Sequence, residues 1–102
     1  MSNINIPFMP KWKQKMLSRQ KTATSRTHKY GMVGDNFEIF NHTFRITQIS
    51  FISLELIAEY FYKQEGCDNP NEFIEIWKQI HPIMGWQPKR KVYIHLFHLE
   101  GE

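Results

Sequence analysis

The chain has 102 residues, a length that fits one domain over 1–102 with a single core. It carries 13 Lys and Arg side chains against 10 Asp and Glu, which gives a formal net charge of +3. Hydrophobic residues make up 41% and charged residues 23%, near the globular average, so a predominantly disordered chain is excluded. The one cysteine, Cys67, excludes an internal disulfide and a four-cysteine zinc site.

The first half of the sequence predicts strands around one short helix. Apolar residues alternate over 4–8, and Met9, Trp12 and Met16 then fall at helical spacing, which predicts a helix over 11–18 with a basic outer side. The phase of the apolar residues changes near Thr47, which predicts a β-bulge there. The further elements predicted in this half are a strand over 22–27, a loop over 28–35, and strands over 37–39 and 43–51.

The second half predicts two helices and a closing strand. Apolar residues at 54, 57, 58 and 61 predict a helix that ends at Gly66. Asn69 is placed to cap the next helix, with Pro70 at its first position and Glu72 placed for a capping box. Residues 92–99 are apolar on both faces, so this strand should be central in its sheet.

This order of elements is typical of an α+β domain. Strands joined by short turns favour a mostly antiparallel sheet, and about five strands of this length need helices to cover them. We therefore predict a small curled β-barrel of about five strands with flanking helices.

Basic residues are concentrated near the N-terminus. Residues 1–51 carry eight basic against two acidic side chains, and seven of the eight lie between Lys11 and Lys29. Such a cluster suits phosphate contacts, although a solvated basic face is the alternative. No apolar run approaches the ~18 residues that cross a bilayer. The N-terminus also lacks a signal-peptide pattern, so we expect a cytoplasmic protein with no membrane partner.

The densest polar segment, 21–29, offers nucleophile chemistry. In a strand Thr22, Thr24 and Arg26 share one face, and Lys21 lies just before it. A hydroxyl beside an ammonium group of lowered pKa is one way to make a nucleophile. An arginine on the same face could hold a phosphate or a base edge. An ordinary edge strand is the alternative, because threonine is a good strand former.

Other polar and aromatic residues give weaker signals. Glu65 lies at the C-terminal end of a predicted helix, where its negative charge interacts unfavourably with the helix dipole. This misfit hints at a functional role. The alternative is a solvated side chain at a frayed helix end. Trp86, in a loop, could stack on a base or close the end of the barrel. His95 and His98 lie three apart on a strand and face opposite sides, and the five histidines form no ligand motif. We therefore expect no metal and no cofactor.

The sequence resembles the ASCH domain, a small relative of the PUA RNA-binding fold. The resemblance rests on residues 16–26 with their Lys-Thr-x-Thr-x-Arg core at 21–26, on Gly34-Asp35 before a strand, and on Glu65-Gly66. It continues through Trp77 and His81-Pro82 to the closing strand. The resemblance implies a β-barrel with flanking helices and a basic cleft. The sequence departs from the family at Arg19, where a small residue, usually glycine, is expected.

One branch of this family hydrolyses the acyl amide of 4-acetylcytidine and related nucleosides. By resemblance the catalytic residues are Lys21, Thr24 and Glu65, with Arg26 lining the pocket. This assignment requires the three side chains to meet around one cavity sized for a nucleobase. The other residues that we expect to contact a nucleoside or RNA are Thr22, His28, Lys29 and Trp86.

Other ASCH proteins are proposed to bind or cleave RNA, so two alternatives stay open. One is a non-catalytic RNA-binding module, in which the basic surface follows phosphates while aromatic side chains stack on bases. The other is a ribonuclease that uses the same cleft. In each case the partner is a nucleoside or RNA, and we expect a monomer.

Overall fold

Five strands and three α-helices follow one another in the predicted order in the computed structural model, which describes residues 2–101. The α+β prediction is therefore confirmed. The first elements are β1 (Asn3–Ile4), the 3-10 helix η1 (Pro10–Trp12), α1 (Lys13–Leu17), β2 (Ala23–Arg26) and β3 (Asn36–Ile39). The later elements are β4 (His42–Ser53), α2 (Leu54–Tyr60), α3 (Pro70–Ile80) and β5 (Lys91–Leu99).

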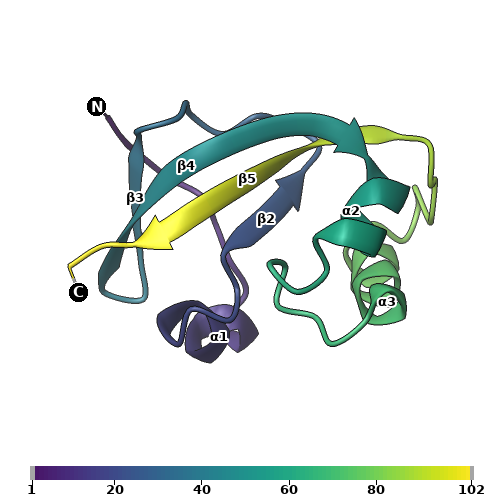
Figure 1. Cartoon of the computed structure of the whole chain (residues 1–102), viewed down its shortest axis with the longest axis horizontal. Helices are drawn as coiled ribbons and strands as arrows, with labels where there is room; N and C mark the ends of the chain where they lie inside the picture. Colours follow the sequence, from purple (N-terminus) through teal and green to yellow (C-terminus); the bar gives the residue numbers. More distant parts are fainter. Residues whose placement is uncertain (1, 102) are drawn as a thin grey trace.

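The strands form one curled sheet in the order β1-β3-β4-β5-β2 (Figure 1). Only β1 and β3 are parallel, and the other neighbours are antiparallel. The apolar strand β5 lies between β4 and β2, away from the edges, as its two apolar faces predict. The register of β4 shifts between Ile46 and Gln48, which confirms the predicted bulge. β2, which carries the densest polar segment, is an edge strand.

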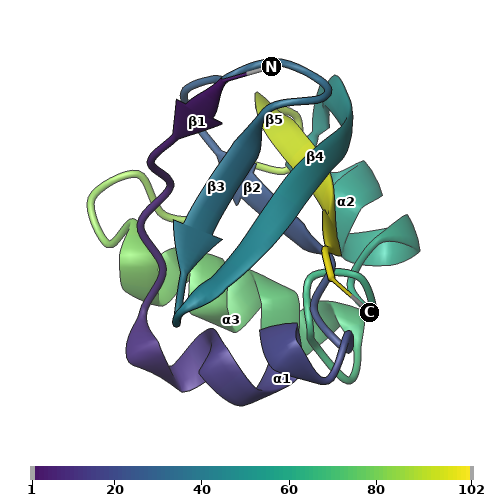
Figure 2. The same ribbon diagram turned by 90° about the vertical axis from the view of Figure 1, so that its left-hand side faces the viewer.

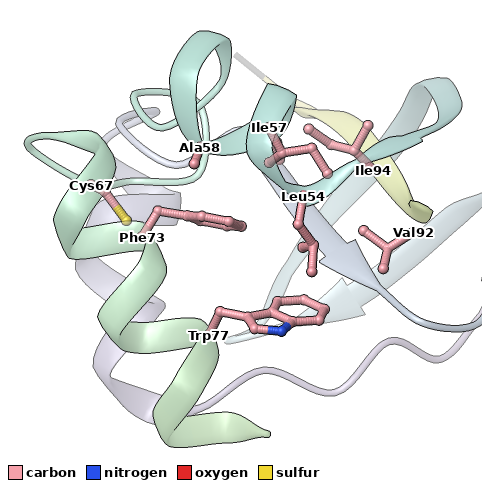
Figure 3. Packing of buried hydrophobic residues seen from close by; sticks show 9 residues of the cluster. Leu54, Ile57, Ala58, Cys67, Phe73, Trp77, Val92 and Ile94 are labelled. Atoms are coloured by element: carbon pink, nitrogen blue, oxygen red, sulfur yellow. The ribbon is translucent and has the colours of Figure 1, made fainter. Parts of the chain in front are cut away.

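The helices α1 and α3 lie along the same side of the sheet (Figure 2). Two clusters of buried apolar residues fill the interior. One joins α2, α3 and β5 through residues such as Leu54, Phe73, Trp77 and Val92 (Figure 3). The other joins the N-terminal segment to β3, β4 and β5 through residues such as Trp12, Met16, Phe37, Phe44 and Phe97. Together the clusters fix α3 and the N-terminal segment against the sheet.

The start of α3 follows its sequence signals. The Asn69 side chain accepts a hydrogen bond from the Glu72 N–H at 2.9 Å, and Pro70 is the first helical residue. The Glu72 carboxylate accepts from the Asp68 N–H at 2.6 Å, one residue earlier than in a standard capping box. A well-defined start fixes which face of α3 packs against the apolar core.

Two element boundaries differ from the predictions by more than two residues. The first strand is Asn3–Ile4 instead of 4–8, because Pro7 has no N–H to donate to a neighbouring strand. The prediction that a helix ends at Gly66 is wrong, since α2 ends at Tyr60 and Phe61 leaves the helical conformation at φ −126°. The apolar periodicity also stops at Phe61. Residues 61–66 instead form a series of turns, which we call the 61–66 turn segment.

Candidate functional site

A cavity of about 300 Å³ lies between β2, the 61–66 turn segment, α3 and the segment that leads into η1. Residues from all four regions line it, with Phe8, Trp12, Thr24, Glu65 and Trp77 among them. Lys21 and Arg26 line it as well. Its volume lies at the lower end of the range of about 300–1,000 Å³ for small-molecule sites. The three side chains predicted to be catalytic therefore border one cavity.

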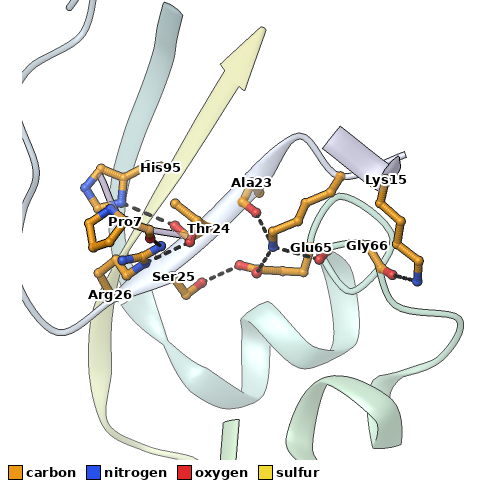
Figure 4. Close-up of polar contacts among 10 residues, drawn as sticks. Pro7, Lys15, Ala23, Thr24, Ser25, Arg26, Glu65, Gly66 and His95 are labelled. Carbon is orange, nitrogen blue, oxygen red and sulfur yellow. Dashed lines mark hydrogen bonds and ion pairs between the residues drawn. The ribbon is translucent and has the colours of Figure 1, made fainter. Parts of the chain in front are cut away.

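Lys21 is a buried lysine with its ammonium group fully engaged. Its Nζ donates to the carbonyl oxygens of Ala23 at 2.8 Å and Glu65 at 2.9 Å, and to Glu65 Oε1 at 3.4 Å (Figure 4). The same atom lies 4.3 Å from the centre of the Trp12 ring, a cation–π contact. Burial lowers the pKa of Lys21 below its usual value, and the nearby Glu65 opposes this effect. A lysine of lowered pKa gives up its proton more readily than an ordinary lysine.

The 61–66 turn segment brings Glu65 to Lys21. The N–H groups of Thr22 and Ala23 both donate to the Gln64 carbonyl, at 2.7 and 2.9 Å, and join the turns to the start of β2. Gly66 has φ +90°, and a Cβ on it would lie 3.1 Å from the Lys21 Cβ, so this close approach favours glycine. Glu65 is thus held by the backbone on both sides.

The Glu65 carboxylate has two partners from opposite ends of one short stretch of chain. Oε1 faces Lys21, and Oε2 accepts a hydrogen bond from the Ser25 hydroxyl at 2.5 Å (Figure 4). The side chains of Lys21 and Glu65 are only 4% and 6% exposed, so their ion pair is buried. Ser25 was not predicted as a site residue, because strand alternation places it on the face opposite Thr24 and Arg26. The turn segment brings Glu65 to that second face, and no spacing in the sequence signals this.

Thr24 and Arg26 form a second polar group on β2. Arg26 Nε donates to Thr24 Oγ1 at 2.9 Å, and its Nη2 donates to the Pro7 carbonyl at 2.6 Å. The guanidinium group lies 5.0 Å from the centre of the Phe8 ring and 5.5 Å from that of Tyr30. These contacts hold a cation beside the Thr24 hydroxyl at the cavity wall.

His95 supports this group from β5 and is completely buried. Its Nε2 accepts from the Tyr30 N–H at 2.9 Å, and its Nδ1 faces the Thr24 carbonyl at 3.2 Å. These two partners require the neutral ring with its proton on Nδ1. Burial, aided by the positive charge of Arg26, lowers the pKa of His95 below 6.5.

We expect acid to destabilise the fold through His95. As the pH falls below about 6.5, His95 binds a proton in the unfolded chain but stays neutral in the folded chain. The unfolding free energy therefore decreases by up to about 1.4 kcal/mol per pH unit. Urea unfolding between pH 7.5 and 5 measures this slope. His95→Gln should flatten it, whereas His98→Gln, which changes an exposed residue on the same strand, should leave it unchanged. Equal slopes for the wild type and His95→Gln would contradict the assignment.

Two further residues of the cavity wall were not predicted as site residues. Burial raises the pKa of Cys67 to about 11, so its thiol stays protonated at neutral pH and is a poor nucleophile. Trp77 stacks on His81 with ring centres 3.9 Å apart, and its Nε1 has no hydrogen-bond partner among residues 2–101. Sequence periodicity assigned Trp77 to the core, and it is indeed 97% buried, but it also forms part of the cavity wall.

The remaining predicted binding residues are dispersed. His28 lines the cavity, whereas Lys29 lines a second, more open one beside Phe51. Trp86 packs against Phe73 with ring centres 6.3 Å apart, as expected for a residue that closes one end of the core. Thr22 is half-buried and joins β2 to the turns through its backbone. The cavity therefore does not include Thr22, Lys29 or Trp86.

Neither a metal site nor a membrane-spanning helix is present among residues 2–101. No group of three or more His, Cys, Asp or Glu side chains in this range is placed to hold a metal ion. No helix in the same range is long and apolar enough to cross a membrane.

Comparisons with known proteins identify the fold. The chain matches no protein-family model, and no curated protein matches its sequence. Among solved structures, an ASCH domain from Lactobacillus crispatus superposes with a TM-score of 0.71 over 96% of this chain and 79% of its own, at 13% identity. The chain has the fold of the ASCH domain.

Two other solved structures share this ASCH fold. The hypothetical protein PH0355 matches with a TM-score of 0.73 and 14% identity, over 97% of this chain and 99% of its own. Protein EF3133 from Enterococcus faecalis matches with a TM-score of 0.64 and 19% identity, over 88% of this chain and 70% of its own. At these identities the likeness establishes the fold alone.

The departure from the ASCH pattern at Arg19 has a structural counterpart. Arg19 has φ +66°, in the left-handed region that favours glycine. Its Nη1 donates to the Leu99 carbonyl at 3.0 Å, which links the end of α1 to the end of β5. The arginine therefore adopts a glycine-like backbone and gains a contact that glycine could not make.

Proposed function

We propose that this chain is an amidohydrolase that removes the acyl group from the exocyclic amine of an N4-acylated cytidine. The observation that carries the proposal is the buried Lys21–Glu65 pair, with Thr24 and Arg26 on the wall of the same cavity. Structural ion pairs also occur in cores, but this pair borders a cavity large enough for a small molecule and carries a lysine of lowered pKa.

In the proposed reaction the Thr24 hydroxyl oxygen attacks the acyl carbonyl carbon. Lys21 first gives its extra proton to Glu65 across their 3.4 Å contact, and the neutral Lys21 amine, released from the Ala23 carbonyl, then takes the Thr24 proton. Arg26 lies beside Thr24 and stabilises the negative charge that forms on the carbonyl oxygen. The carbon–nitrogen bond then breaks, and Glu65 returns the proton to the departing amine. Water attacks the resulting Thr24 ester, releases the carboxylic acid and restores the hydroxyl.

The cavity wall suits a flat ring with an apolar acyl group. Aromatic and aliphatic side chains of α3, among them Phe73, Ile76 and Trp77, face the polar side chains of β2 across the cavity. An apolar wall with a few placed polar groups is the usual composition of a small-molecule site. The substrate in this proposal is uncharged at its reacting end.

The first test is turnover of N4-acetylcytidine by the purified chain, followed as release of acetate and cytidine. Thr24→Ala is expected to lower turnover by about 10³-fold or more while nucleoside binding changes little, because only the attacking hydroxyl is lost. Isothermal titration with cytidine measures the binding. A Thr24→Ala variant that retained the wild-type rate would contradict the role of Thr24, and an inactive wild type would contradict the proposed reaction.

An RNA-binding module is the second candidate, and the exposed basic residues near the N-terminus favour it. Lys11, Lys13 and Lys29 are exposed, and none of them pairs with a carboxylate among residues 2–101. Binding of single-stranded RNA through such lysines weakens with salt, with a slope of about −0.7 per phosphate contact. Turnover of a neutral nucleoside should barely respond to salt. A salt titration with a short RNA, set beside the deacylation assay, separates the two functions.

A further inference from the structure

Ser25 donates the shorter of the two hydrogen bonds that reach the Glu65 carboxylate. Its Oγ lies 2.5 Å from Glu65 Oε2, whereas Lys21 Nζ lies 3.4 Å from Oε1. Lys21 is closer to two backbone carbonyls than to this carboxylate, so the ammonium group is positioned mainly by backbone. Hydrogen bonds to an ionised acceptor are short when they are strong, and their strength falls steeply with distance and misalignment. The distances therefore identify Ser25 as the closer hydrogen-bond partner of the Glu65 carboxylate.

Because of where Glu65 lies, the hydrogen bond from Ser25 determines the conformation of the Glu65 side chain. The residue lies in the 61–66 turn segment, outside any helix or strand, and is 5% exposed. A buried carboxylate oxygen without a donor is costly, and a side chain on a turn has several rotamers open to it. Ser25 comes from β2, which is hydrogen-bonded to β5, so its hydroxyl is held in place by the sheet.

We propose that Ser25 is a positioning residue that orients the Glu65 carboxylate toward the cavity for proton transfer. The proposal deepens the proposed function and rests on it for its kinetic consequence. Ser25 Oγ holds Oε2, which leaves Oε1 on the side of Lys21, where the proposed proton transfers take place. No covalent step passes through Ser25. Its contribution is to keep the carboxylate in one rotamer.

The kinetic test compares Ser25→Ala with Ser25→Thr. Loss of the hydroxyl should lower kcat for N4-acetylcytidine about 10- to 100-fold with KM nearly unchanged, because misplacing a catalytic group by about 1 Å has effects of this size. Threonine keeps the hydroxyl and suits a strand, so Ser25→Thr should restore most of the rate. Ser50→Ala, a serine on β4 outside this cavity, is the matched control and should keep the wild-type kcat.

A spectroscopic test does not depend on activity. The carboxyl 13C signal of Glu65, assigned by its loss in Glu65→Gln, should move in Ser25→Ala and stay near its wild-type position in Ser25→Thr. If the wild type fails to deacylate N4-acetylcytidine while this pattern is observed, the proposed function fails and the positioning role stands.

Three results would overturn the proposal. One is an unchanged Glu65 signal in a folded Ser25→Ala variant, and another is an unchanged kcat in that variant. The third is an acyl group found on Ser25 by mass spectrometry of the quenched reaction, because Ser25 would then be the attacking group.

Discussion

Glu65→Gln should lower the turnover of N4-acetylcytidine by about 10²- to 10⁴-fold, the usual contribution of a general acid–base group. Glutamine preserves the size of the side chain, and its one oxygen can accept from Lys21 while its NH2 group donates to the Ser25 hydroxyl, but it cannot take up and return a proton. Initial rates at saturating substrate measure the effect. A Glu65→Gln variant within threefold of the wild-type kcat would remove Glu65 from the mechanism.

The same substitution should also destabilise the fold, because it leaves the Lys21 ammonium buried without its counter-charge. Removing one member of a buried pair costs about 3–5 kcal/mol, and we expect the lower end because two backbone carbonyls still accept from Lys21. Glu65 raises the pKa of Lys21, so its removal lowers that pKa further. Between the folded pKa and the unfolded value of 10.5 the unfolded chain binds more protons. The stability of Glu65→Gln relative to the wild type should therefore recover as the pH rises, which urea unfolding from pH 7 to 10 measures.

A double variant separates the two effects. Lys21→Met combined with Glu65→Met replaces the buried pair with apolar side chains of similar volume, a change that is often neutral or stabilising. We expect its stability to lie between those of Glu65→Gln and the wild type, because the Ser25 hydroxyl and two backbone carbonyls lose a hydrogen-bond partner, and its turnover to be as low as that of Glu65→Gln. A double variant as unstable as Glu65→Gln would indicate that the loss comes from packing instead of from an unpaired charge.

Local chemistry accounts for the parts of the fold that the sequence predicts correctly. The start of α3 needs only Asn69, Pro70 and Glu72, and every signal lies within four residues of the others. The β4 bulge is visible as a change of phase near Thr47 because strand alternation has a period of two. Such features depend on contacts between near neighbours in the chain.

The site is less predictable because it is built from distant segments. Glu65 meets Lys21 and Ser25 only after the 61–66 turn segment docks on β2, across a sequence separation of 40 or more residues. Alternation identified one face of β2, with Thr24 and Arg26, and gave no reason to consider the other. Sequence periodicity correctly predicts that the indole of Trp77 is buried. Whether a buried ring packs in the core or lines a cavity depends on which segments lie opposite it in the fold, and the periodicity of one helix does not contain that information.

Phe97→Ala should lower the unfolding free energy by about 3–5 kcal/mol, the largest single loss that we expect from the apolar core. Phe97 is 4% exposed and meets Phe8, Phe37 and Phe44 edge-on, with ring centres 5.4–5.9 Å away. Phe37 in turn stacks on Phe44 at 5.3 Å. Edge-to-face pairs add about 0.5–1.5 kcal/mol each beyond the area they bury, although neighbouring pairs are not additive. A domain with about 5–15 kcal/mol of stability would lose a large part of it.

The cluster also links stability to the site, because Phe8 both packs on Phe97 and lies under the Arg26 guanidinium. A Phe97→Ala variant that is still folded at low temperature should therefore show a raised KM for N4-acetylcytidine as well as a lower unfolding free energy. Phe51→Ala is the matched control, since Phe51 is 52% exposed and contacts one aromatic ring, that of Tyr93. Its loss should stay below about 1 kcal/mol, as for surface substitutions. Urea unfolding measures the unfolding free energy of both variants. Equal losses for Phe97→Ala and Phe51→Ala would show that the cluster of Phe8, Phe37, Phe44 and Phe97 does not hold the N-terminal segment to the sheet.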